Sequence, residues 1–224
     1  MSRLIVTIPR SLMRVTKVNW WIDWRGQSGG SGNDGTEQVV YNKFPRWIGS
    51  PEMRLRGEAI LQWRAHMMSA RGRVGVFRVP MVDALSYAPD LYGGSSNGIP
   101  FNTGQRFATG QGFADTPVVL NLTAAVAGAT TLEISDADAP LEIRQGVYIS
   151  HNDWPYVVTS VTKDGPAKII TIETPLREAI PALGLIDLDA KGLFVAETDT
   201  MGNPEYGKDL KATPTATFVE WINR

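Results

Sequence analysis

The sequence predicts a mainly β protein with a single helix, and three observations support this. Apolar residues make up 43% and charged residues 20% of the 224 residues, which is typical of a folded globular chain. Short runs of β-branched and aromatic residues, separated by Gly, Pro, Asn and Asp, recur along most of the chain. Apolar residues repeat at helical spacing in one segment alone.

Strands are expected in the N-terminal part at residues 3–8, 15–24 and 36–48. Between them, the Gly- and Ser-rich residues 26–35 predict a flexible loop. Residues 50–72 carry Leu55, Ala59, Trp63 and Met67 at four-residue spacing, with Ile60 and Met68 beside them, and this predicts the helix. The helix starts either at the Ser-Pro-Glu sequence 50–52 or, as we prefer, near Gly57. A strand at 74–79 follows, closed by Pro80.

Residues 83–117 are rich in Gly, Pro, Ser and Asn but also carry five aromatic residues. This composition is typical of a linker or an interaction arm, and the aromatic residues favour the arm. From residue 118 on, short strands with turn signals at about eight- to twelve-residue intervals predict a small barrel or sandwich. The apolar end at Phe218, Val219 and Trp221 needs a core to enter, so we expect it to join the N-terminal part. The predicted domains are 1–82 with 191–224, and an inserted β domain at 118–190.

Charge is divided unevenly along the chain. Residues 1–82 carry thirteen Lys and Arg against five Asp and Glu, whereas residues 83–224 carry nine against eighteen. Either each part simply solvates its own surface, or the basic part meets a complementary or polyanionic partner. Trp20 and Trp21 are consecutive in a predicted strand and therefore point to opposite faces. One face is the core, and the other must meet a second layer, a neighbouring chain or a sugar.

No catalytic, cofactor or metal site is recognisable, and the chain contains no cysteine. His151 and Asp153 could belong to a triad, but a turn is the simpler interpretation of this segment. His66 suits the helix dipole better than ligation. Asp136, Asp138 and Glu142 resemble a calcium loop only loosely, and residues 26–35 lack the GK[ST] of a phosphate-binding loop. We therefore expect no enzyme, cofactor or metal. The first apolar run is too short for a signal peptide, and no stretch is long enough to span a membrane.

Several short motifs are similar to those of one protein family. In the first part they are residues 26–27, 38–40, Pro45-Arg46-Trp47, 63–66 and 70–80, the last reading ARGRVGVFRVP. In the second part they are residues 142–149, 156–158 and 174–177, the last reading TPLR. Together they resemble the distal tail proteins found at the tail tips of long-tailed, non-contractile phages. The Gly/Ser insertion at 28–35 and the arm at 83–117 depart from that pattern.

The resemblance implies a tail-tube-like β-sandwich or split barrel with one helix, carrying an inserted small, OB-like β-barrel. It implies a structural virion protein, synthesised in the host cytoplasm, that forms a ring, typically a hexamer. The ring would join the tail tube to the hub and to the receptor-binding or fibre proteins. DNA would pass through its lumen only in transit, and no membrane would be involved.

Six residues are predicted to form the assembly interface: Trp21, Arg46, Arg54, Arg56, Arg71 and Arg73. Glu52 and Glu58 are too few to pair with so many arginines, so a neighbouring acidic surface is expected to meet them. That surface is either the region of Asp136, Asp138 and Glu142 in another subunit or the tail tube. Two other functions stay open. A glycan-binding adhesin module of a phage tail would need exposed aromatic residues in a cleft, and a hydrolase would need convergent carboxylates with raised pKa values.

Overall fold

A computed structural model describes residues 3–40, 42, 44–87, 101, 103–110, 117–136, 139, 142–164 and 167–224. The protein is mainly β, as predicted, with one α-helix among these residues. The chain divides into unit 1 (Met1–Val79 and Leu193–Arg224) and unit 2 (Pro80–Gly192). The arm expected at 83–117 falls within the span of unit 2, and most of it lies outside the described residues.

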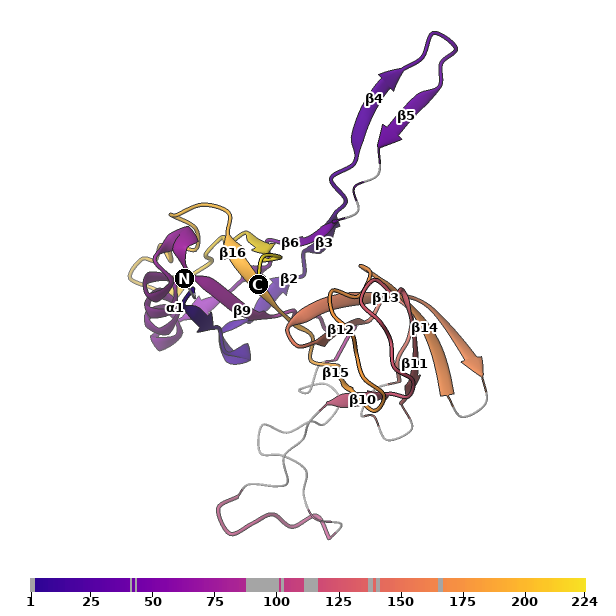
Figure 1. Cartoon of the computed structure of the whole chain (residues 1–224). Coiled ribbons are helices and arrows are strands. Elements are labelled where there is room, and N and C mark those ends of the chain that lie inside the picture. Colours follow the sequence, from indigo (N-terminus) through magenta and orange to yellow (C-terminus); the bar gives the residue numbers. More distant parts are fainter. Residues whose placement is uncertain are drawn as a thin grey trace. The chain divides into compact units, whose positions relative to one another are not determined.

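Unit 1 is built on a six-stranded sheet to which both ends of the chain contribute (Figure 1). In spatial order its strands are β1 (Ile5–Thr7), β9 (Val76–Pro80), β16 (Lys191–Ala196), β18 (Phe218–Glu220), β6 (Arg46–Gly49) and β3 (Trp20–Asp23). The β1–β9 pair is parallel, whereas β16–β18, β18–β6 and β6–β3 are antiparallel. The predicted strand at 15–24 is in fact two, β2 (Val15–Lys17) and β3.

One face of this sheet forms the core of unit 1. The Trp20 ring lies over Gly49, where a Cβ would come within 2.1 Å of the ring. Phe194 and Phe218 pack against Trp20 with ring centroids 5.1 and 6.3 Å from it. Trp47 and Phe77, both 1% exposed, extend the same layer. These large side chains account for the burial that the apolar C-terminal segment requires.

The helix α1 (Glu58–Ala70) begins directly after Gly57, so the later of the two predicted starts is correct. Residues 50–56, given to the helix in the longer alternative, instead contain β7 (Glu52–Met53) and β8 (Leu55–Arg56). β7 pairs with β2, and β8 pairs with β17 (Lys211–Ala212). Met53 and Leu55 are buried and two residues apart, which is the alternation of strand residues and not helical spacing. In α1 the buried residues are Ile60, Trp63 and Ala70, whereas Met68 is 72% exposed and not part of the core. Two 3-10 turns, η1 (Arg10–Leu12) and η2 (Gly72–Val74), complete the unit.

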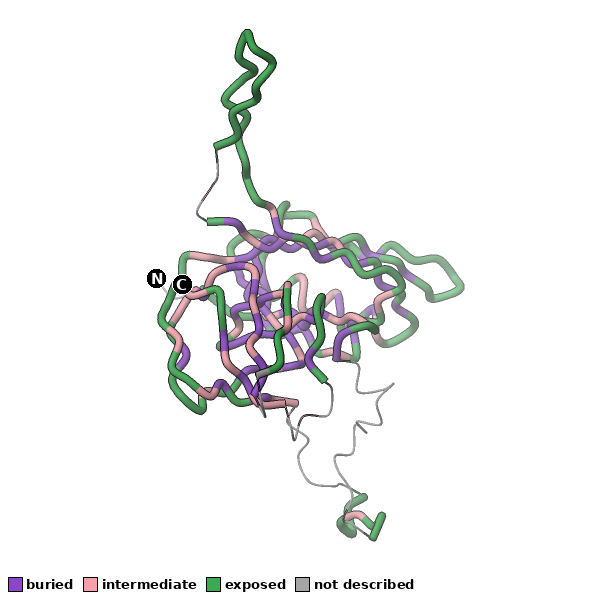
Figure 2. Tube along the Cα trace, turned by 90° about the vertical axis from the view of Figure 1, so that its right-hand side faces the viewer, coloured by how far each residue is buried: buried purple, intermediate pink, exposed green. Residues whose placement is uncertain are grey.

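Residues 26–35 were expected to form a flexible loop, and this is wrong. They contain β4 (Gln27–Ser31), which pairs with β5 (Glu37–Val40) as a hairpin. The Asp34 carboxylate accepts hydrogen bonds from the Thr36 hydroxyl (2.7 Å) and the Thr36 N–H (3.1 Å), which lowers the Asp34 pKa. These local bonds give a Gly-rich backbone a preferred turn. Every residue of both strands is exposed, as Figure 2 shows.

Unit 2 is a closed antiparallel barrel, which agrees with the predicted inserted barrel. In order around the barrel its strands are β10 (Val118–Asn121), β11 (Thr131–Ser135), β14 (Ala167–Glu173), β13 (Trp154–Asp164), β12 (Tyr148–His151) and β15 (Leu185–Asp187). The six strands are one more than the five of an OB-fold, because residues 185–187 add a short strand that the sequence did not reveal. Residues including Ile134, Tyr156 and Ile170 fill the interior.

In the described part of the chain, no helix is long and apolar enough to cross a membrane.

Candidate assembly surface

Trp21 lies on the face of the unit 1 sheet that points away from the core. Its side chain is 69% exposed, whereas that of Trp20 is 3% exposed, so the two consecutive residues face opposite sides as predicted. The strand register places Trp21 opposite Ile48, Ile48 opposite Val219, and Val219 opposite Val195. These four residues, the Trp21 row, form an apolar band across four strands with an exposed indole at its end.

Arg46 lies on the same face as the Trp21 row, two residues along β6 from Ile48. It is opposite Asp23, and its Nε lies 3.2 Å from Asp23 Oδ2. Both side chains are about one-third exposed, so the pair is screened by solvent and contributes little to folding stability. Arg46 is therefore paired within its own chain, contrary to the expectation that it awaits a partner.

Arg54 and Arg56 flank Leu55 beside the helix start. Met53 and Leu55 are both 0% exposed, so strand alternation turns the two arginines outward. Arg56 lies opposite Lys211 in the β8–β17 pair, which adds a like charge nearby. No carboxylate of the described residues forms an ion pair with either guanidinium. The two arginines form a basic edge of unit 1.

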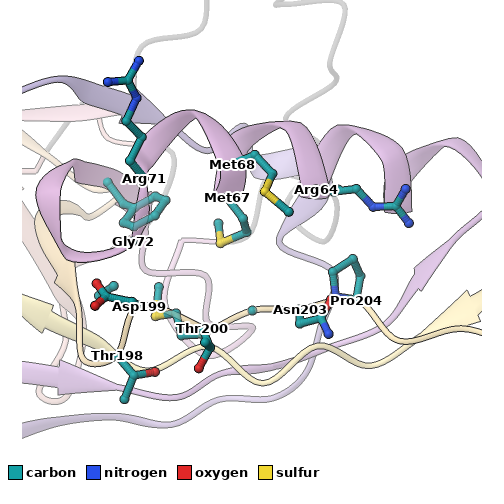
Figure 3. Close-up of a pocket in the computed structure, with 14 residues that line it drawn as sticks. Arg64, Met67, Met68, Arg71, Gly72, Thr198, Asp199, Thr200, Asn203 and Pro204 are labelled. Atoms are coloured by element: carbon teal, nitrogen blue, oxygen red, sulfur yellow. The ribbon is translucent and has the colours of Figure 1, made fainter.

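Arg71 and Arg73 lie at the C-terminal end of α1, where a cation complements the helix dipole. Arg71 adopts the left-handed conformation (φ 55°) that ends the helix. Asp199 Oδ1 accepts a hydrogen bond from the Arg73 N–H (2.9 Å) and lies 3.6 Å from Arg73 Nε. In Figure 3 the Arg71 side chain points away from the segment that carries Asp199. Arg73 is thus paired and Arg71 is exposed.

A groove of about 430 Å³ runs between the last turns of α1 and the segment 198–204 (Figure 3). The Trp63 Nε1–H donates to the Gly202 carbonyl (2.7 Å) and fixes this segment against the helix. Met67, Met68 and Met201 line the groove, and Arg64 and Arg71 stand at its margins. Methionine side chains adapt to the shape of an apolar partner, so the groove suits contact with a protein segment.

The carboxylates expected to pair with the arginines are engaged elsewhere. Glu52 pairs with Lys17 (2.9 Å), and Glu58 accepts a hydrogen bond from the Gln62 side chain (3.3 Å). In unit 2, Lys168 Nζ lies 2.7 Å from Asp136 Oδ2 and 2.9 Å from Glu142 Oε1. Asp136 and Glu142 are therefore not an unpaired acidic face, which corrects that expectation. Asp138, the third member of the expected face, lies outside the described residues.

Lys168, Asp136 and Glu142, named here the Lys168 group, shift one another's pKa values. Burial raises the Asp136 pKa, but hydrogen bonds from Lys168 and from the Ile143 N–H outweigh it and hold that pKa below its ordinary value. The hydrogen bond from Lys168 lowers the Glu142 pKa. Burial lowers the Lys168 pKa, but the two carboxylates outweigh it and raise that pKa. The group ties the segment before β12 to β14.

His151 is the last residue of β12, and Asp153 follows it in a turn. His151 Nδ1 donates to the Leu185 carbonyl (2.7 Å), and its Nε2 lies 3.6 Å from Glu178 Oε1, so its carboxylate neighbour is Glu178 and not Asp153. Asn152 and Asp153 have φ of 47° and 65° and form the two-residue turn between β12 and β13. This confirms the interpretation of the segment as a turn. His66 is half-buried on α1. No group of three His, Asp or Glu suited to a metal ion occurs in the described ranges.

The predicted interface residues therefore occupy three separate places on unit 1: the Trp21 face, the β8 edge and the end of α1. Ile48, Val195 and Val219, which extend the Trp21 face, were missed because their meeting depends on the register of distant strands. The uneven distribution of charge along the chain also distinguishes the two units. Unit 1 contains sixteen basic and ten acidic residues, a net of +6, and unit 2 contains six and thirteen, a net of −7.

No family model and no curated protein matches the chain.

Proposed function

We propose that the protein is a structural subunit that assembles into a closed ring at the distal end of a phage tail. The carrying observation is the opposite charge of its two units, +6 and −7. A subunit with two unlike surfaces can bind its neighbour head to tail, and such contacts close into a ring when the rotation allows it. The exposed Trp21 and the arginines are residue types that anchor protein interfaces.

The phage tail setting rests on the motif resemblance and gives the proposal its expected partners. They are the tail tube on one side and the hub and fibre proteins on the other, with DNA passing through the lumen. A ring that serves as a mount needs no catalytic centre, and the proposal assigns none.

A glycan-binding adhesin is less well supported. Sugar binding would need aromatic rings exposed inside a cleft. Methionines line the groove of unit 1 instead, and its aromatic residue Phe77 is 1% exposed.

The experiment is charge reversal at Arg54, Arg56 and Arg71, the predicted interface arginines that are exposed and form no ion pair with a carboxylate of the described residues. Replacing Arg54, Arg56 and Arg71 with Glu should leave the monomer folded, because all three side chains are exposed. The variant should no longer form rings, as measured by negative-stain microscopy and sedimentation. The matched control reverses Arg25, Lys163 and Lys208, which are also exposed, and changes the net charge equally. Rings formed by the first triple variant would overturn the role of this basic surface, and a wild-type chain that never assembles would overturn the proposed function.

A further inference from the structure

Arg14 extends the basic edge that Arg54 and Arg56 form on unit 1. The Arg54 N–H donates to the Arg14 carbonyl (3.0 Å), and Val15 lies opposite Met53, so Arg14 lies opposite Arg54 across the two chain segments. Both side chains are exposed, and like charges that face each other across paired strands destabilise a sheet. Arg14, Arg54 and Arg56 are named here the arginine edge.

The carboxylates beside the arginine edge are paired with lysines. Glu52 lies 2.9 Å from Lys17. Asp209 lies 3.4 Å from Lys211, which is opposite Arg56 in the β8–β17 pair. No guanidinium group of the arginine edge forms an ion pair with a carboxylate of the described residues. Three positive charges therefore stay uncompensated within the described chain, which costs folding stability and indicates an anionic partner.

Unit 2 carries free carboxylates on the outer wall of its barrel. Leu132 and Ile172 are buried inside, at 2% and 0% exposure. Alternation therefore turns Glu133 of β11 and Glu173 of β14 outward, and these two strands pair with each other. Among the described side chains of unit 2, Glu133 and Glu173 are the carboxylates that form neither a hydrogen bond nor an ion pair. They are named here the glutamate wall.

Neutral hydroxyl side chains separate the two glutamates. Thr131 lies opposite Thr171 in the rows between them, and Ser160 of β13 also lies opposite Thr171. Carboxylates and hydroxyls accept hydrogen bonds, whereas a guanidinium group only donates them and can bind a carboxylate with two parallel bonds. The glutamate wall thus matches the arginine edge in charge and in hydrogen-bonding capacity, and on both surfaces the matching groups are unpaired.

We infer that the arginine edge of one copy binds the glutamate wall of a second copy. The inference rests on the proposed ring function and names the two surfaces that meet. Because the surfaces differ and lie in different units, the contact is heterologous, and each copy uses its edge toward one neighbour and its wall toward the other. The glutamate wall takes the place of Asp136 and Glu142, whose carboxylates Lys168 already holds.

The test exchanges the charges of the two surfaces. Arg54→Glu with Arg56→Glu places carboxylates on both sides of the contact, and Glu133→Lys with Glu173→Lys places cations on both sides. Each double variant should associate about a hundredfold or more weakly than the wild type in sedimentation, because like charges then meet. The chain that carries all four substitutions should associate again, since opposite charges face each other in every contact. Thermal unfolding checks that each variant is folded.

Arg14→Gln provides a second readout. It removes the like charge opposite Arg54, so the variant should unfold at the same or a higher temperature, while association weakens about fivefold. Arg25→Gln is the matched control. Arg25 is also an exposed arginine of unit 1 but lies outside the arginine edge, and its replacement should leave association unchanged.

Double variants that assemble as the wild type does, or a fourfold variant that stays dissociated, would overturn the inference and leave the ring function standing. A labelled DNA duplex that binds the wild type but not Arg54→Glu with Arg56→Glu, while rings persist, would show that the edge binds nucleic acid and would overturn it too. If the lysines unfold the barrel, Glu133→Gln with Glu173→Gln replaces them, and unchanged association would then count against the inference. A wild type that never assembles would overturn both proposals.

Discussion

At the scale of single residues, Lys168 is distinctive because a lysine that is only 9% exposed needs partners for its charge. Asp136 and Glu142 supply them, and Asp136 is itself largely buried. Nothing in the spacing of residues 136, 142 and 168 predicts this group. The acidic residues were instead expected to form a docking face, because the pairing depends on the segment before β12 folding back over β14.

Replacing Lys168 with Met should destabilise the barrel by about 3 kcal/mol, because it leaves the Asp136 carboxylate buried without its cation. Urea unfolding of the full chain would measure the loss. Lys163, opposite Lys168 in the β13–β14 pair but exposed, is the matched control, and Lys163→Met should change the free energy of unfolding little. Equal effects of the two substitutions would contradict the role given to Lys168.

The same group sets a pH dependence. The Asp136 pKa is lowered in the folded chain, so its contribution to stability is present above the unfolded pKa near 3.8 and is lost as pH falls through the lower folded pKa. The Lys168 pKa is raised, so its contribution is present below 10.5 and is lost as pH rises through the higher folded pKa. Urea midpoints measured across pH should fall at both ends, and Lys168→Met should flatten both slopes. Unchanged slopes would contradict the assignment.

At the scale of elements, side-chain periodicity predicted what local sequence controls. The four-residue spacing of Ala59, Trp63 and Met67 located the helix, although Leu55, the first residue of that pattern, lies in β8. Alternation placed Trp20 and Trp21 on opposite faces, and in the structure Trp20 is the buried one. The hairpin of β4 and β5 was missed, because composition alone marks Gly and Ser as loop formers and ignores the Asp34–Thr36 bonds. The Trp21 row could not be predicted, because its strands meet only through long-range register.

The packing of β3 on β6 should be sensitive to one methyl group. Gly49→Ala would place a Cβ within 2.1 Å of the Trp20 ring, which is confined by Phe194 and Phe218. Overpacking there should cost about 3 kcal/mol in the free energy of unfolding. Gly26→Ala is the control, since its nearest contact would be an ordinary 3.7 Å. Chemical denaturation would compare the two, and a tolerated Gly49→Ala would show that the ring can move aside.

At the scale of the whole molecule, the chain comprises two units with separate cores, one of them discontinuous in sequence. Removing residues 213–224 would take β18 from between β16 and β6 and divide the unit 1 sheet. Unit 1 should then lose its folded structure, while the barrel keeps its own core. Limited proteolysis with mass spectrometry should show cleavage throughout residues 1–79 and protection of 118–190. Protection of both regions would contradict this account of the sheet.

The central position of β18 also orders events during synthesis. The Trp47 N–H bonds to the Glu220 carboxylate, 173 residues further along the chain. When the ribosome has made the whole of unit 2, β6 still lacks the strand that joins it to β16. The barrel can therefore fold on the nascent chain, as domains commonly do. The exposed apolar strands of the first 79 residues must wait, and during that interval they are the part of the protein that a chaperone would have to shield.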